Sequence, residues 1–202
     1  DNISIGTDKL KVSAASVAHG GTLYLQKSGS GDFLASQNMN GGNTNTTFDL
    51  AKTVGGSDLD EGTYSDVIIT IEDEAGNQTA FTLTTFIIDV TPPVGEVTTQ
   101  IASPRMNNTP VIIVRASDAV SILDNQITVT ATVTISGNPG ITVYLKEVAG
   151  SFATSVDITG ANTPETLEIA KLSDGTGLPD GTYTDLKFVF TDQANNSSGP
   201  VT

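Results

Sequence analysis

Residues 59–66 read Leu-Asp-Glu-Gly-Thr-Tyr-Ser-Asp, and residues 178–185 read Leu-Pro-Asp-Gly-Thr-Tyr-Thr-Asp. Each copy runs into an apolar segment and then a second turn, Asp-Glu-Ala-Gly-Asn at 73–77 and Asp-Gln-Ala-Asn-Asn at 192–196. Glycine in the first turn permits a positive φ, and a tyrosine two residues later can fold its ring onto a core while its hydroxyl bonds back to the turn. The pattern predicts such a tyrosine corner, with a buried ring, in each copy.

The repeat extends well beyond these turns. Tyr64 and Tyr183 lie 119 residues apart, and Thr-Leu-Tyr-Leu-Gln at 22–26 recurs 120 residues later as Thr-Val-Tyr-Leu-Lys at 142–146. Apolar residues alternate with polar ones in these segments, which is typical of half-buried strands. The sequence therefore predicts two copies of one all-β unit. A strand is also predicted at Phe48 to Lys52, and at its counterpart from Leu167 in spite of the helix-start signal Thr-Pro-Glu before it.

The strand after each tyrosine changes phase. Val67, Ile69 and Ile71 share one face, whereas Tyr64 lies three residues before Val67 and so falls on the other face. We predict a bulge at residues 65–66, and an equivalent bulge at 184–185, that returns the tyrosine ring to the core. An aspartate in such a bulge is placed to accept backbone N–H bonds.

The order of these motifs resembles the bacterial immunoglobulin-like (Big-type) repeats of large surface proteins. The resemblance rests on Gly-Thr-Tyr-Ser-Asp, a β-run, Asp-x-Ala-Gly-Asn, a further strand, and Ile-Asp-Val-Thr-Pro-Pro at 88–93. It implies two tandem immunoglobulin-like Greek-key β-sandwich domains, residues 1–89 and 90–202, in an extracellular or cell-surface setting. The paired prolines form a stiff linker that cannot continue a ladder of strand hydrogen bonds.

Composition narrows the classes of partner. The 202 residues include 9 Lys and Arg against 23 Asp and Glu, a net charge of −14, which disfavours nucleic acid and anionic membranes. There is no cysteine, and no apolar run approaches the roughly 20 residues of a membrane helix. No signal peptide is recognisable, so we expect any export signal to lie outside these residues.

The two copies are out of phase with the ends of the sequence. Residues 92–123 have no counterpart before residue 1, and the predicted strand 81–88 has no counterpart after residue 196. Two interpretations are open. The sequence is a piece of a longer array, which we favour, or the missing strands are donated by neighbouring subunits.

Catalytic motifs are scarce. His19 is the single histidine, so a hydrolase triad would need it as the base, and no Gly-x-Ser-x-Gly elbow accompanies it. One histidine and no cysteine exclude a structural zinc site. Turn chemistry explains Asp73 to Asn77, since the aspartate caps the turn and Gly-Asn tolerates positive φ. We predict no enzyme activity and no required cofactor.

The topology of such sandwiches predicts an acidic junction between the domains. The corner of the first domain, the linker, and the turns of the second domain would meet there. The candidate residues are Asp58, Asp60, Glu61, Asp89, Asp192 and either Asp118 or Asp124. Loop carboxylates suit Ca²⁺, which takes six to eight oxygen ligands. Two interpretations are open: a calcium site that stiffens the linker, and side chains that are simply solvated.

A structural role follows as the predicted function. We expect a spacer, stalk or adhesive repeat of a long secreted or cell-surface protein. The alternatives are an extracellular filament subunit completed by donated strands, and a non-catalytic module of an exported enzyme. The predicted partners are neighbouring repeats of the same chain or neighbouring subunits, with a surface receptor or glycan also open. No nucleic acid and no membrane insertion are expected.

Overall fold

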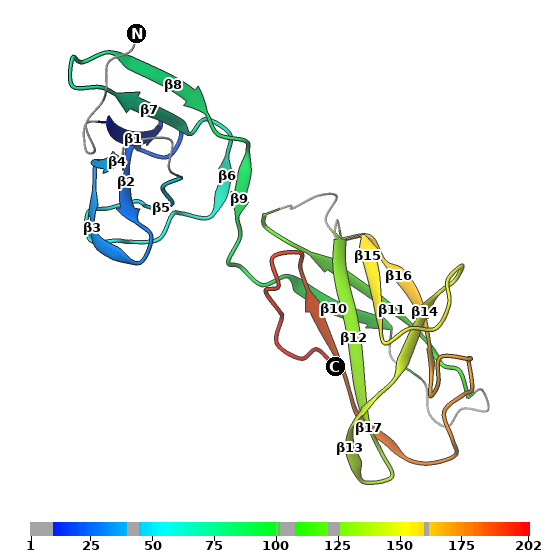
Figure 1. The fold of residues 1–202 in the computed structure, drawn as a ribbon. Coiled ribbons are helices and arrows are strands. Elements are labelled where there is room, and N and C mark those ends of the chain that lie inside the picture. Colours follow the sequence, from blue (N-terminus) through cyan, green and yellow to red (C-terminus); the bar gives the residue numbers. More distant parts are fainter. Residues whose placement is uncertain (1–9, 40–44, 100, 102–107, 121–125, 160–161) are drawn as a thin grey trace. The chain divides into compact units, whose positions relative to one another are not determined.

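The computed structural model describes residues 10–39, 45–99, 101, 108–120, 126–159 and 162–202 (Figure 1). Regular structure in these residues consists of β-strands joined by antiparallel pairing, so the all-β prediction is confirmed. The same residues contain no helix long and apolar enough to cross a membrane. The chain divides into two compact units, Asp1–Ile88 and Asp89–Thr202, one residue before the boundary expected from the sequence.

The described part of the first unit forms nine strands. They are β1 (Leu10–Ser16), β2 (Gly21–Lys27), β3 (Ser30–Leu34), β4 (Ser36–Met39), β5 (Phe48–Ala51), β6 (Gly62–Tyr64), β7 (Ile68–Glu72), β8 (Gln78–Thr82) and β9 (Phe86–Ile88). Strand β1 pairs with β2, β4 and β7, and β8 pairs with the far side of β7. Strand β2 pairs with β1 near its start and with β5 and β3 further along, so it passes from one layer to the other.

Alternation along these strands builds the core of the first unit. Val12 and Ala14 on β1, Leu23 and Leu25 on β2, and Ile69 on β7 are buried together. Tyr64 and Val67 complete the buried cluster. This is the pattern expected when every second residue of a strand faces the same layer.

The tyrosine corner of the first unit is present as predicted. Tyr64 is 1% exposed, and its hydroxyl donates a 2.9 Å hydrogen bond to the carbonyl oxygen of Asp60. Its ring is stacked between His19, at a centroid distance of 3.7 Å, and Phe86, at 5.0 Å. The stack joins the β1–β2 turn to β9.

The predicted strand from Phe81 to Ile88 is wrong as one element. It is divided into β8, which pairs with β7, and β9, which pairs with β6. Between them the Leu83 N–H donates to the carbonyl oxygen of Val67 at 2.8 Å, which turns the chain toward the other layer. The predicted bulge at residues 65–66 is likewise replaced by a break between β6 and β7.

The described part of the second unit forms eight strands in two facing sheets. One sheet has the order β10 (Val94–Thr99), β11 (Val111–Ser117), β16 (Glu165–Ala170), β14 (Tyr144–Glu147). The other is built on β12 (Gln126–Ile135), which pairs with β13 (Asn138–Thr142), β15 (Ser155–Thr159) and β17 (Tyr183–Thr191). Residues 197–201 bridge to β17, in the place that β8 takes beside β7. The prediction that nothing after residue 196 corresponds to the segment from Phe81 is therefore wrong for its β8 part.

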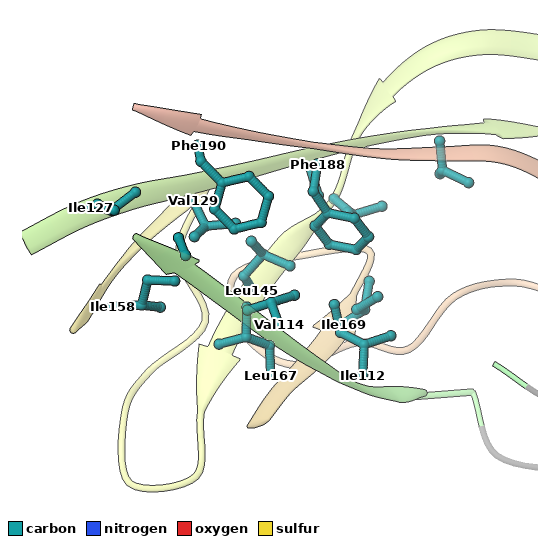
Figure 2. Packing of buried hydrophobic residues seen from close by; sticks show 14 of the residues in the cluster. Ile112, Val114, Ile127, Val129, Leu145, Ile158, Leu167, Ile169, Phe188 and Phe190 are labelled. Atoms are coloured by element: carbon teal, nitrogen blue, oxygen red, sulfur yellow. The ribbon is translucent and has the colours of Figure 1, made fainter. Parts of the chain in front are cut away.

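Figure 2 shows the core of the second unit between these sheets. Ile112 and Val114 of β11 lie on the same side as Leu167 and Ile169 of β16, and the rings of Phe188 and Phe190 of β17 face them. Phe190 is fully buried, and a Cβ added to Gly95 of β10 would lie 2.0 Å from its ring. The backbone of β10 therefore lies directly on this ring.

The second tyrosine corner is less complete than predicted. The Tyr183 hydroxyl donates to the carbonyl oxygen of Pro179, but its ring is only half-buried. The bulge is present here, since Thr132 pairs with Lys187 but Thr134 pairs with Thr184, which leaves one extra residue on β17. Asp185, at φ 51°, occupies the bulge.

Candidate functional site

Three of the predicted carboxylates lie together within the second unit. Ligand oxygens of Asp89, Asp118 and Asp192 all lie within 4.8 Å of one another. Asp89 begins the unit, Asp118 follows β11, and Asp192 follows β17. Asp89 and Asp192 are 9% and 8% exposed, so two of these charged groups are largely withdrawn from water.

The turn after β17 holds Asp192 in a fixed orientation. Its Oδ1 accepts the Asn196 N–H at 2.9 Å, and its Oδ2 accepts the Asn196 side-chain amide at 3.0 Å. Asn195 has the positive φ of 69° that this turn requires. The turn at Asp73 and Asn77 in the first unit makes the same two hydrogen bonds, with Gly76 at φ 82°. The structure thus bears out the turn chemistry expected at both places.

Asn196 also ties the linker to the second unit. Its side-chain amide donates to the backbone carbonyl oxygen of Asp89 at 3.1 Å and reaches the Asp89 carboxylate at 3.5 Å. The Asp89 carboxylate in turn accepts the Thr91 N–H at 3.3 Å. A single asparagine therefore bridges two of the three clustered carboxylates. Its link to Asp89 spans 107 residues, so no local sequence pattern predicts it.

The donor set fits a hard divalent cation. Asp118 accepts the Val120 N–H through Oδ1, while its Oδ2 is buried and has no hydrogen-bond partner in the described structure. A buried carboxylate oxygen without a partner is costly, and three neighbouring carboxylates repel one another. Calcium accepts carboxylate and carbonyl oxygens and would relieve both effects.

The remaining candidates are placed differently. Asp124 lies outside the described residues. Asp58, Asp60 and Glu61 belong to the first unit, where the Asp60 carboxylate forms an exposed 2.5 Å ion pair with Lys52. Their meeting with the second-unit cluster stays a prediction.

A second polar cluster lies in the first unit, behind the tyrosine corner. The buried Ser16 hydroxyl donates to Asp66 Oδ1 at 2.6 Å, and His19 Nδ1 lies 3.0 Å from the same hydroxyl. Asp66 Oδ2 accepts the Ala18 N–H at 2.8 Å, the backbone bond expected from the sequence. Sequence reasoning missed Ser16, since no spacing rule relates it to Asp66.

These three residue types occur in hydrolase triads, but the direction of the bonds is different. A catalytic serine gives its proton to histidine, which is held by the carboxylate. Here the Ser16 hydroxyl donates its hydrogen bond to Asp66, so His19 Nδ1 must be the donor to the Ser16 oxygen. With Ser16 0% exposed, the hydroxyl is not placed to meet a substrate. The arrangement fastens the β1–β2 turn to the segment between β6 and β7.

Asp66 makes the first unit sensitive to acid. The Ser16 hydroxyl, followed by the Ala18 N–H, holds the pKa of Asp66 below its usual range. A depressed folded-state pKa stabilises the fold above the unfolded-state value of about 3.9, and this contribution is lost as the pH falls through the folded-state value. We expect the urea midpoint of the first unit to fall below about pH 4. Asp66→Asn should have a lower midpoint at pH 7 and a shallower decline in acid, and parallel curves for the two proteins would contradict this role.

Neither a protein-family model nor a curated protein matches the chain.

Proposed function

We propose that the chain is a load-bearing spacer: two tandem immunoglobulin-like repeats of a secreted or cell-surface protein. The supporting observation is the internal duplication. The pairing of β2 with β5 in the first unit has its counterpart in that of β14 with β16 in the second, and each unit carries the same hydroxyl-bonded tyrosine and the same aspartate–asparagine turn. Repetition of a whole unit, rather than elaboration of one pocket, is typical of proteins that span distance.

The short connection supports a mechanical role. Only Asp89 to Pro93 separates β9 from β10, and its first residue is bonded to Asn196 of the second unit. Pro93 is buried, so the connection is held at its end as well. A spacer needs connections that do not extend freely under load.

The proposal includes calcium at Asp89, Asp118 and Asp192. The ion would bind the native second unit and not the unfolded chain, so its stabilisation of that unit would increase with the logarithm of its concentration above the dissociation constant. Its role would be structural, because it would neutralise clustered carboxylates at the start of the unit and fix the linker there.

Single-molecule stretching of the full chain tests both parts. We expect two discrete unfolding steps, in proportion to the lengths of the two units, and a higher force for the longer step in millimolar calcium than in chelator. Asp118→Asn should remove the calcium effect, because it removes a ligand charge but leaves an oxygen for the Val120 N–H. Asp174→Asn is the matched control: its carboxylate caps a turn in the same unit, through the Thr176 N–H at 2.8 Å, outside the cluster.

The experiment can contradict the spacer role and the calcium site independently of each other. A chain that extends without discrete steps is not a load-bearing spacer. Two steps with equal forces in calcium and chelator would keep the spacer and remove the calcium site.

A further inference from the structure

Strands β5 and β16 occupy equivalent positions in the two repeats, but only β16 has a neighbour on both of its edges. In the second unit β16 lies between β14 and β11, with Ile112 opposite Leu167 and Val111 opposite Glu168. In the first unit the matching strand β5 pairs with β2, and the described residues place no strand on its other side.

Backbone geometry identifies the groups on this open edge. Thr47 accepts the Ser28 N–H through its carbonyl oxygen at 3.0 Å, so Thr47 and Asp49 face β2. Because antiparallel strands alternate in direction, the backbone groups of Phe48 and Leu50 face outward. Their counterparts in the second unit are Leu167 and Ile169, and the Ile169 N–H donates to the Pro110 carbonyl oxygen at 2.9 Å, on the β11 side.

The apolar side chains of β5 are less buried than their counterparts on β16, which has the additional neighbour β11. Leu167 and Ile169 are 0% and 1% exposed, whereas Phe48 and Leu50 are only partly buried. Ile71 of β7 is also only partly buried, although its counterpart Phe190 lies fully buried under β10. Strand β11 adds Ile112, Val114 and Ala116 to the second core, the layer that Figure 2 shows opposite Phe188 and Phe190.

We propose that the outer edge of β5 is the docking site for a strand pair of the β10–β11 type, in the register that β11 takes on β16. In sequence order this pair would stand before β1, as β10 and β11 stand before β12. The docked strand would place alternating apolar side chains over Phe48, Leu50 and Ile71 and would receive the outward N–H groups of β5. Strand addition of this kind combines backbone hydrogen bonds with pockets for alternate side chains.

An interface that the chain already contains indicates the occupant. The β11–β16 contact is the same edge, in the other copy of the unit, with its partner present. The docking strand should therefore have the apolar alternation of Val-Ile-Ile-Val-Arg-Ala at 111–116.

Amide exchange of the full chain, with and without an added strand pair, tests the proposal. The probe is a copy of residues 92–117 fused directly before Asp1, so that nine residues separate the copied β11 from β1, against eight between β11 and β12. In the unextended chain we expect the Phe48 and Leu50 amides to exchange at least tenfold faster than those of Leu167 and Ile169. The fusion should slow Phe48 and Leu50 at least tenfold, leave Thr47 and Asp49 unchanged, and remain monomeric.

The control fusion carries Ile112→Lys and Val114→Lys in the added copy only. Equal protection by the two fusions would overturn the proposed register, and no protection by either would overturn the docking site. Protection of Phe48 and Leu50 in the unextended chain that grows with protein concentration would identify a second copy as the occupant and overturn the proposed source. These readouts involve neither calcium nor force, so they are independent of the proposed function.

Discussion

Replacing Tyr64 with alanine should destabilise the first unit by about 3–5 kcal/mol, the usual cost of removing a large buried ring. The ring is 1% exposed and lies between those of His19 and Phe86, so its loss removes two stacking contacts and leaves a cavity. Tyr64→Phe keeps the stack and loses the hydrogen bond to Asp60, at about 1 kcal/mol. Urea unfolding followed by far-ultraviolet circular dichroism measures both changes.

Tyr183→Ala is the comparison within the same chain. Tyr183 has the equivalent hydrogen bond, but its ring is half-buried. Its replacement should therefore lower the midpoint of the second unit by less than Tyr64→Ala lowers that of the first. Equal shifts for the two variants would show that the stack contributes nothing.

Replacing Gly95 with alanine should destabilise the second unit by about 3 kcal/mol, the upper part of the usual range for overpacking a core. The new Cβ would lie 2.0 Å from Cδ2 and 2.2 Å from Cε2 of Phe190, and this ring is 0% exposed. Neither the ring nor the strand can move without disturbing the packing between the sheets. The urea midpoint of the second unit measures the cost.

Gly199→Ala is the matched control, since a Cβ there meets nothing within 4 Å. Gly95→Ala combined with Phe190→Leu should recover part of the loss, because the smaller side chain leaves room for the methyl group. A double variant whose losses are simply additive would show that the two positions do not interact.

Strand segments with strict alternation could be predicted from the sequence alone. The predicted strand at Phe48 to Lys52 is found as β5, and the one from Leu167 is found within β16 in spite of the helix-start signal before it. Local turn chemistry was equally readable, because the Asp73 and Asp192 turns depend on residues four positions apart. In these cases the deciding contacts are near in sequence.

Pairing partners could not be predicted in the same way. The apolar residues from Phe81 to Ile88 read as one strand, yet the choice between β7 and β6 as partner depends on where Leu83 meets Val67. The half-buried ring of Tyr183 could not be predicted either, because its burial depends on side chains from distant parts of the chain. Its equivalent in the first unit is covered by His19 and Phe86, and Pro139 stands at the position corresponding to His19.

The candidate site was predictable in part. The concentration of acidic residues near turns and the linker indicated the region. Topology then grouped seven candidates, of which the structure brings Asp89, Asp118 and Asp192 together. The sequence gives no sign of Asn196 as their bridge, because an asparagine in a turn already has a sufficient local role.

The bond between Asn196 and Asp89 has a consequence during synthesis on the ribosome. The two residues are 107 positions apart, and Asp89 emerges first. At roughly 5–20 residues per second, Asn196 is added some 5–20 s after Asp89. Throughout that interval the nascent chain keeps a slack tether behind the first unit, which has time to fold before the linker is fixed. Order of emergence therefore separates the folding of the two units in time and lowers the chance that strands of one repeat pair with the equivalent strands of the next.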